Sequence, residues 1–466
     1  MSATHSGYIN SSHVQPEFER KLSSYIASAL SDPLPDHVEE RAKLHILDTI
    51  AAIVSGSRLT PGKKAIAYVA SEGGRPEAMV IGSNCLTSAV NAALANGMSA
   101  HADETDDSSA AGAMHPGCIV FPAALAAAEK WARSGTDLIR ATALGYDLAV
   151  RFALALGAYK FHNAGHAVPG FCGVFGAAGA AAALAGLDAP ATGAALSYAA
   201  QQASGLSSWR RDADHIEKAF VFGGMPARNG MAAVTMVASG MTGVVDVFSG
   251  SPNFLGTFGV VGATSSSLIA ELGIEFEIAK TTIKKWCVGS PVQPALDAIE
   301  ILMKERGLKA EQVKSICIHL PTTALTIVDK TTMPDLNIRN LAGALLVNSA
   351  LTFDMIHDHR QLTSPSALDM ARRIDVQGSE ELEALRPQRQ AIVVVDLKSG
   401  ERLTHRTYVV RGTIENPMTS EEVEAKAFDL LAPVLTKARA ANTLETIRNL
   451  ESVADVRTLR DLLMLA

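Results

Sequence analysis

The spacing of apolar residues in the first half of the chain is helical almost throughout. Between residues 17 and 265, apolar positions recur every three to four residues, which is the period of an amphipathic helix. Proline and glycine mark the joins between segments. The pattern predicts helices over 38–55, 91–98, 118–132, 136–156, 173–187, 190–202 and 226–239. Pro122 falls near the expected start of one of them, where a missing amide hydrogen costs little.

The pattern changes near residue 265. Alternating apolar and polar residues over 313–320 predict a strand, and two further runs around Ser399-Gly400 predict a β-hairpin over 391–397 and 402–410. Helices are expected over 296–306, 340–352 and, with Ser420 as N-cap, 421–436. We therefore predict a mainly α protein. A large, discontinuous all-helical domain spans 1–265 plus 413–466, and a smaller α+β lid domain spans 266–412.

Composition excludes several classes of protein. A net charge of −7 over 466 residues, without an evident basic face, argues against a nucleic-acid-binding protein. The five cysteines lie far apart and form no CxxC pair, which argues against a zinc ribbon and favours a reducing compartment. Residues 1–19 lack the apolar segment of a signal peptide, and the apolar run 174–187 is too short to span a bilayer. We expect a cytoplasmic protein without a membrane contact.

One loop, residues 100–117, carries two histidines and four carboxylates between two apolar helices. An ordinary polar connection would explain this composition as well as a functional site does. Unpaired charge inside a protein is costly, however, so such clusters often belong to sites. Asp103, Asp106 and His115 offer groups for acid–base chemistry, or for orienting a histidine. A metal site is the minority alternative, because the ligands do not recur at helical spacing.

Further candidates lie in other glycine-rich, apolar settings. His166 precedes a glycine-rich helix start, where an anion can bind. Lys218 adjoins an apolar run and can carry a proton or a charge, and Arg228 can clamp a carboxylate. Lys284 lies near the expected domain junction, where ligand sites are common. The simpler alternatives are a structural histidine, solvated lysines and an arginine paired on its helix. Motifs of nucleotide-binding proteins and serine hydrolases are absent.

The order of these segments resembles the MmgE/PrpD family over nearly the whole chain. The matching pieces are the acidic segment leading to His-Pro-Gly, the histidine before a glycine-rich helix, the lysine segment ending in Asn-Gly, the lysine–cysteine segment and a late Asn-Pro segment, at 103–117, 166–173, 218–230, 284–298 and 416–422. The resemblance implies a large helical domain with a smaller α+β lid and a homodimer. It also implies lyase or isomerase chemistry on small di- or tricarboxylates, without a metal or another cofactor.

Departures from the family pattern narrow the expected activity. The family includes 2-methylcitrate dehydratases, cis-aconitate decarboxylases and iminodisuccinate epimerases. In this chain Lys218 lacks its usual basic neighbours, Gln293 stands where a histidine is common, and Asn340 falls near a usual tyrosine. Dehydration needs a well-placed acid, whereas epimerisation needs only removal and return of a proton. The set is most similar to the iminodisuccinate epimerase branch.

We therefore expect a cofactor-independent epimerase or racemase that abstracts a proton next to a carboxylate, acting on iminodisuccinate. The expected catalytic residues are Asp103, His115, His166, Lys218 and Lys284. The expected substrate-binding residues are Asp106, Ser109 and Arg228. The alternatives are a hydro-lyase of the 2-methylcitrate dehydratase type or a related tricarboxylate decarboxylase, and a silent carboxylate-binding protein.

Overall fold

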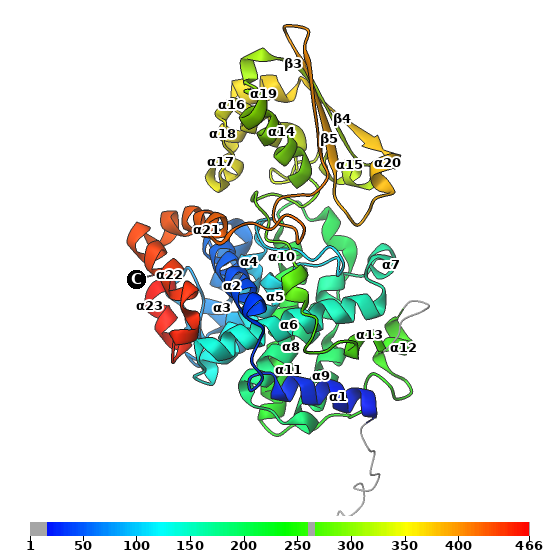
Figure 1. Cartoon of the computed structure of the whole chain (residues 1–466). Coiled ribbons are helices and arrows are strands. Elements are labelled where there is room, and N and C mark those ends of the chain that lie inside the picture. The colour runs from blue at the N-terminus through cyan, green and yellow to red at the C-terminus, as the bar shows by residue number, and fades with distance from the viewer. Residues whose placement is uncertain (1–15, 260–265, 466) are drawn as a thin grey trace, which may run out of the picture.

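The computed structural model describes residues 16–259 and 266–465, so most of the N-terminal segment in which we sought a signal peptide lies outside the described residues. Two units are visible in Figure 1. The N-terminal half and the C-terminal helices form a large helical unit, and the intervening segment forms a smaller unit that contains the main sheet. The predicted fold class, mainly α with a smaller α+β unit, is confirmed. The domain boundaries stay a prediction.

The helical unit is built around one apolar helix, α8. The elements of its N-terminal part are α1 (Glu17–Ser28), α2 (Asp36–Gly56), α3 (Thr60–Glu72), β1 (Ala78–Met79), β2 (Leu86–Thr87), α4 (Ala89–Ala100), α5 (Gly117–Lys130), α6 (Gly135–Leu156), α7 (Ala158–Asn163), α8 (Val168–Ala185), α9 (Ala189–Gln202), α10 (Ile216–Ala219), α11 (Met225–Ala238), α12 (Phe254–Phe258) and α13 (Ser266–Ile269). Helices α5, α6, α9 and α11 pack around α8. A Cβ atom on Gly176 of α8 would lie 2.4 Å from the Gly145 carbonyl oxygen of α6, so these helices require glycine at their contact.

Helix α8 begins earlier than predicted because Pro169 occupies its first turn, where proline is tolerated, instead of ending the preceding loop. The helix therefore has 18 residues, and by length and composition alone it could cross a membrane. However, 94% of it is buried inside the protein, as expected for a core helix. The cytoplasmic location stays a prediction.

Some predicted element ends were wrong. Pro122 lies inside α5 and not at its start, because the helix already begins at Gly117. Thr419, not Ser420, caps α21 (Ser420–Leu435), since its hydroxyl accepts a hydrogen bond from the amide of Glu422 in a capping box. The second hairpin strand ends at Thr407, before the predicted end.

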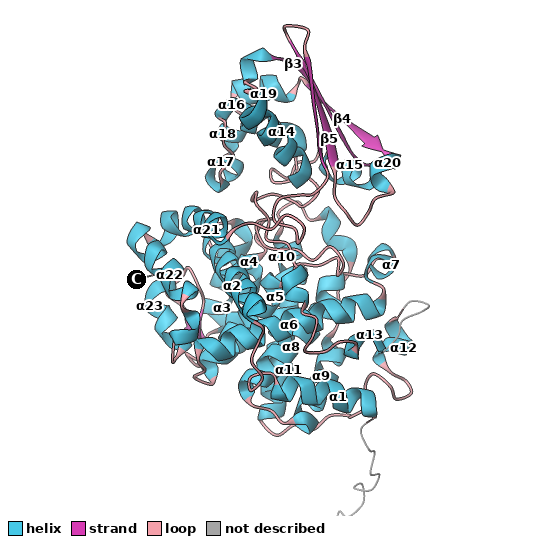
Figure 2. Cartoon of the chain, viewed as in Figure 1, coloured by secondary structure: helices cyan, strands magenta, loops and turns pink. Residues whose placement is uncertain are grey.

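The smaller unit contains a four-stranded sheet in the order β4-β3-β5-β6 (Figure 2). Its elements are α14 (Gln293–Arg306), β3 (Val313–Pro321), α15 (Thr322–Val328), α16 (Ile338–Asn348), α17 (Phe353–His357), α18 (His359–Leu362), α19 (Pro365–Ala371), β4 (Ile374–Ser379), α20 (Glu380–Glu383), β5 (Ala391–Leu397) and β6 (Arg402–Thr407). Strand β3 is parallel to β4 and antiparallel to β5, with Ile318 opposite Val376 and Val393. Alternate residues of β5 are buried, and α14 packs against β5 and β6.

The C-terminal helices return to the helical unit. They are α21 (Ser420–Leu435), α22 (Lys437–Arg448) and α23 (Arg460–Leu463). Helix α21 packs against α2, and in Figure 1 α21 lies to the left of the loops that join the two units. This packing brings residues 36–56 and the C-terminal part of the chain together.

Candidate active site

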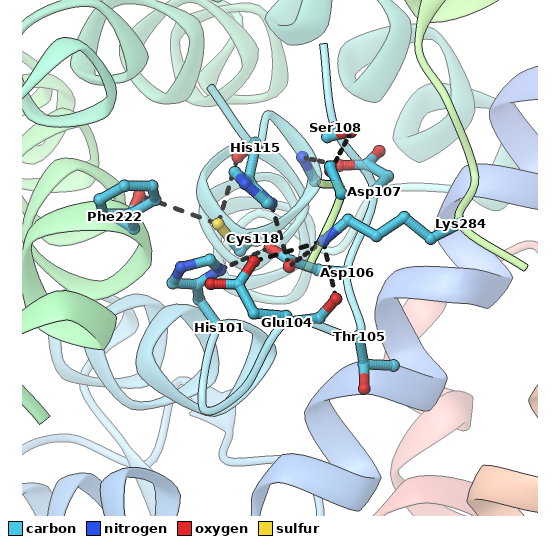
Figure 3. A network of polar contacts seen from close by, with 12 residues as sticks. His101, Glu104, Thr105, Asp106, Asp107, Ser108, His115, Cys118, Phe222 and Lys284 are labelled. Atoms are coloured by element: carbon cyan, nitrogen blue, oxygen red, sulfur yellow. Dashed lines mark hydrogen bonds and ion pairs between the residues drawn. The ribbon is translucent and has the colours of Figure 1, made fainter. Parts of the chain in front are cut away.

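Asp106 lies at the centre of a buried polar cluster in the loop between α4 and α5 (Figure 3). One oxygen of its carboxylate lies 2.9 Å from Nδ1 of His101, and the other lies 3.1 Å from Nδ1 of His115. An ionised carboxylate only accepts hydrogen bonds, so each Nδ1 donates to Asp106. Burial would raise the pKa of Asp106, but the two histidines outweigh it and hold that pKa well below its usual range.

Two lysines converge on the neighbouring Glu104. The ammonium group of Lys218 contacts Glu104 Oε1, and Lys284 Nζ lies 3.6 Å from Glu104 Oε2 and 3.8 Å from Asp106 Oδ1. The side chain of Lys284 is only 1% exposed. Burial would raise the pKa of Glu104, yet the two ammonium groups hold it well below its usual range. The cluster therefore keeps two cations and two carboxylates together away from water, where their mutual attraction is strong.

Asp107 points away from this cluster and fastens the loop to the helices behind it. Its carboxylate contacts His45 Nδ1 at 2.7 Å, and accepts hydrogen bonds from the Tyr146 hydroxyl at 2.6 Å and the Gly117 amide at 3.0 Å. The hydrogen bond from the Gly117 amide places the negative charge of Asp107 at the N-terminus of α5, where it interacts favourably with the helix dipole. Adjacent carboxylates of one loop thus serve different purposes, because successive side chains point in opposite directions.

A widened helical turn brings Lys218 to the cluster. The chain forms a π-helical turn over Phe220–Gly224, directly after α10. A Cβ atom on Gly223 would lie 2.1 Å from the Gly97 carbonyl oxygen, so glycine permits the close contact with α4. Phe222 consequently stacks on His101 with ring centroids 4.6 Å apart, and Lys218 Nζ lies 5.3 Å from the Phe222 ring.

Two imidazoles beside the charged groups have a lowered pKa, which favours their neutral form. Burial lowers the pKa of His115, and the charge of Lys284 lowers it further, although Asp106 acts in the opposite sense. Burial and the charge of Lys218 place the pKa of His215 well below its usual range. Within the described residues, the Nε2 atoms of His101 and His215 have no hydrogen-bond partner. These nitrogens can accept a proton or a hydrogen bond from a ligand.

The smaller unit closes the cluster from the opposite side. His357 Nε2, on α17, lies 3.2 Å from Asp103 Oδ2. Asp335 is buried, and burial together with the charges of Glu104 and Asp103 raises its pKa to about 6. The site therefore combines residues from both units.

The structure brings together four of the predicted site residues, Asp106, His115, Lys218 and Lys284. Asp103 is adjacent but faces His357 and the amide and hydroxyl of Thr105 rather than a lysine. Their catalytic and binding roles stay predictions.

Three other predicted residues have structural partners outside the cluster. The His166 ring stacks on Phe161 at 4.1 Å, and the Arg228 guanidinium lies 5.6 Å from the Phe220 ring and bonds to a neighbouring asparagine. The Ser109 hydroxyl accepts from the Gly112 amide and shapes the loop. In the described part of the chain, none of the three contacts the lysines or Asp106.

The sequence prediction missed His101, Glu104, His215, Asp335 and His357. The first two belong to the acidic loop, and His215 lies close to Lys218, so proximity in sequence could have indicated them. Asp335 and His357 carry no such signal, because only the fold brings the smaller unit to the loop.

Among the described residues, two groups of side chains place their ligand atoms within 4.8 Å of one another and could hold a metal ion: His101 with Asp106 and His115, and His101 with Glu104 and His215. In both groups the carboxylate already lies against a lysine. A metal ion would have to compete with these ammonium groups, which disfavours binding. The expectation of a metal-free site stays a prediction.

Comparisons with known proteins cover both units. The model of the MmgE/PrpD N-terminal domain matches residues 20–261, and that of the MmgE/PrpD C-terminal domain matches residues 286–452. The cis-aconitate decarboxylase-like protein oryM of Aspergillus oryzae is 25% identical over 94% of this chain and 95% of its own length. A cis-aconitate decarboxylase of Aspergillus terreus is 26% identical over 95% of both chains. By name these relatives correspond to the lyase alternative and not to the expected epimerase.

Proposed function

Because the chain belongs to the MmgE/PrpD family, we propose that it is a lyase that removes CO2 from a small unsaturated tricarboxylate such as cis-aconitate. The observation that carries the proposal is a buried cluster of cationic and proton-carrying side chains held by carboxylates. Lys218 and Lys284 contact Glu104, and His115 contacts Asp106. The names of the relatives, which match this chain over almost its full length, support the same class of reaction. The substrate class and the homodimer expected from the sequence remain proposals.

The reaction sets three demands on the protein. A C–C bond to a carboxylate breaks, and its electron pair forms a new double bond as CO2 leaves. The electron pair of the old double bond takes up one proton at carbon, so a positioned proton carrier must lie beside the substrate. Negative charge that develops during these steps must be stabilised by groups already in place.

The cluster can meet each demand. Lys284 is a fixed positive charge beside Asp106, and such a buried charge stabilises a carboxylate or a developing anion more strongly than it would in water. Lys218 carries protons and is held by Glu104. His115 is 14% exposed, so it can reach a ligand, and Asp106 fixes its ring with Nε2 available. We assign proton transfer to Lys218 and His115, and charge stabilisation to Lys284.

Epimerisation of iminodisuccinate is the second candidate. It is favoured by the presence of proton-carrying groups on separate segments, namely His115 on the acidic loop and Lys218 in α10. Inversion at carbon requires removal and return of a proton on opposite faces, which two separate segments can provide.

One experiment separates these activities. The purified protein is incubated in heavy water with cis-aconitate, 2-methylcitrate or iminodisuccinate, and each reaction is followed by proton NMR and by trapping of CO2. We expect CO2 from cis-aconitate, in equal amount to a product that has gained one deuterium at carbon. Conversion of the methyl doublet of 2-methylcitrate into an allylic methyl singlet, without CO2, would instead indicate a dehydratase. Deuterium exchange with inversion of iminodisuccinate would indicate the epimerase, and binding without any reaction would indicate a silent protein.

A further inference from the structure

A cavity of about 250 Å³ lies between the two units and borders the charged cluster. Ser108 of the acidic loop and Lys284 line one side of it, and Arg389 lines it from the loop before β5. Its volume is small for a ligand pocket, which suits a small acid better than a nucleotide. Lys284 connects the cavity with the charged cluster, because it lines the cavity and lies against Glu104 and Asp106.

Arg389 has no partner for its charge. It is half-buried, and within residues 16–259 and 266–465 its guanidinium forms no hydrogen bond or ion pair. Burial lowers the pKa of Arg389, and the neighbouring Arg386 lowers it further, although Tyr159 and the more distant charge of Glu104 oppose this. A partly desolvated guanidinium without an anion is unfavourable, whereas a bound carboxylate would satisfy it with two parallel hydrogen bonds.

The other cations on the cavity wall are already paired. Lys280 lies 3.0 Å from Glu275 and 3.1 Å from Glu277. Arg411 donates to Asn416 at 2.6 Å and also contacts Glu422. Of the lysines and arginines that line the cavity in the described chain, Arg389 is therefore the cation that lacks an anionic partner and can bind an anionic ligand.

Backbone contacts hold the segment of the cavity wall that carries Lys284. Gly412 has a φ of 102°, and a Cβ atom there would lie 1.9 Å from the Ile283 carbonyl oxygen, so the loop after β6 packs directly against the Lys284 segment. Ser108 and Thr282 also exchange two backbone hydrogen bonds of 2.9 Å. These contacts hold the Lys284 segment in the cavity wall, while Arg389 lies two residues before Ala391, which pairs with Thr407 of β6.

We propose that this cavity is the substrate-binding site, in which Arg389 binds a carboxylate that does not react while the opposite end of the same acid reaches Lys284. This inference rests on the proposed function, and it adds the residue that binds the terminal carboxylate farthest from Lys284. Arg389 is a specificity-determining residue in this arrangement. It selects for the distant carboxylate and takes no part in proton transfer.

The test uses binding as well as turnover. The probe is tricarballylate, a saturated tricarboxylate that has no double bond and cannot react, measured by isothermal titration calorimetry against the full-length protein. Arg389→Gln should weaken its binding about tenfold to a hundredfold, the range expected for loss of a charged hydrogen-bonded pair. Arg389→Lys should recover part of this loss, because it keeps the charge but not the bidentate geometry.

Arg386→Gln is the matched control. Arg386 lies nearby in the same loop, but it pairs with Glu383 at 3.1 Å and does not line the cavity. Its substitution should leave tricarballylate binding unchanged. In turnover of cis-aconitate, Arg389→Gln should raise KM by the same factor as it weakens binding, with kcat within about threefold of the wild-type value.

A change of ligand separates recognition from a structural defect. The wild-type protein should prefer tricarballylate over methylsuccinate, which lacks one terminal carboxylate, and Arg389→Gln should lose that preference. If the wild-type protein turns over cis-aconitate but Arg389→Gln still prefers tricarballylate over methylsuccinate, the role of Arg389 is overturned and the proposed lyase activity is not. Wild-type protein that binds tricarballylate through Arg389 but releases no CO2 would overturn the lyase and leave the binding site standing. Wild-type protein that releases CO2 from cis-aconitate but binds no tricarballylate would overturn the binding site and leave the lyase standing.

Discussion

The ammonium group of Lys426 lies 2.7 Å from the Asp48 carboxylate, which joins the C-terminal helix α21 to α2 directly behind the charged cluster. Lys426 also donates to the Thr105 carbonyl at 3.1 Å and to the Lys284 carbonyl at 2.9 Å. Burial disfavours its charge, but Asp48 outweighs that effect and raises the pKa of Lys426. One buried ion pair thus fixes the two loops that carry Glu104 and Lys284.

Replacing one member of this pair should destabilise the protein. Lys426→Met leaves Asp48 as a buried charge without a cation, which typically costs about 3–5 kcal/mol. The midpoint of urea denaturation should fall accordingly, and turnover should fall as the two loops lose their common anchor. The double variant with Asp48→Asn should recover much of the stability. Additive losses in the double-mutant cycle would show that the two side chains do not act as a pair.

Much of the architecture was predictable from the sequence, whereas the partners of single side chains were not. Helices with regular apolar spacing, such as α2 and α6, and the hairpin strand β5 lie close to their predicted positions. Strand β4 was missed because it is an edge strand, where only one face is buried and polar residues are frequent.

The contacts of single side chains in the site could not be predicted from the sequence either. A carboxylate cluster was visible in the sequence, but whether Asp103 or Glu104 meets the lysines depends on the direction in which adjacent loop residues point. Lys426 lies in a stretch rich in glutamate and alanine, which indicates a solvated helix face, and only the contact with α2 reveals that it is buried. Such contacts join residues hundreds of positions apart and leave no local pattern.

Glu104→Gln should be far more damaging to turnover than Asp103→Asn. Glu104 contacts both lysines, and removing its charge leaves them without their main counter-ion, so we expect kcat to fall about a hundredfold or more. Asp103 instead pairs with His357, and its substitution should mainly loosen the smaller unit. Steady-state kinetics of the two isosteric variants provides the comparison. A larger loss of kcat in Asp103→Asn would support the role that the sequence suggested for Asp103.

Asp335 should make stability depend on pH. Its pKa of about 6 in the folded protein lies above the ordinary value of 3.8, so the folded state binds the proton more tightly than the unfolded state. The stability associated with this proton is present below pH 4 and is lost as the pH rises to 6 and above. A shift of about two pKa units corresponds to roughly 3 kcal/mol.

Asp335→Asn imitates the protonated form at every pH. The variant should therefore be more stable than the wild type at pH 8 and nearly equal to it at pH 4. Urea denaturation at both pH values, with the wild type in parallel, cancels the contribution of all other titrating groups. A stability difference that does not change between pH 4 and pH 8 would contradict the assignment.

Prolonged treatment with a chelator should leave turnover intact. The carboxylates of both possible metal-ligand groups lie against lysines, which already balance their charge. Activity is measured after dialysis against EDTA and again after addition of single divalent ions. Loss of turnover that one added ion restores would require His101 and its neighbours to be reassigned as metal ligands.

The most direct test of the central claim is CO2 release from cis-aconitate by the wild type and two histidine variants. His115 adjoins Asp106 and Lys284, whereas His166 stacks on Phe161 outside the cluster. Loss of a proton-transfer group typically costs a factor of about 10² to 10⁴ in rate. We predict that the wild type releases CO2, that His115→Gln loses about a hundredfold or more in kcat, and that His166→Gln stays within about threefold of the wild type. No CO2 from the wild type, or a greater loss in His166→Gln than in His115→Gln, would contradict the account.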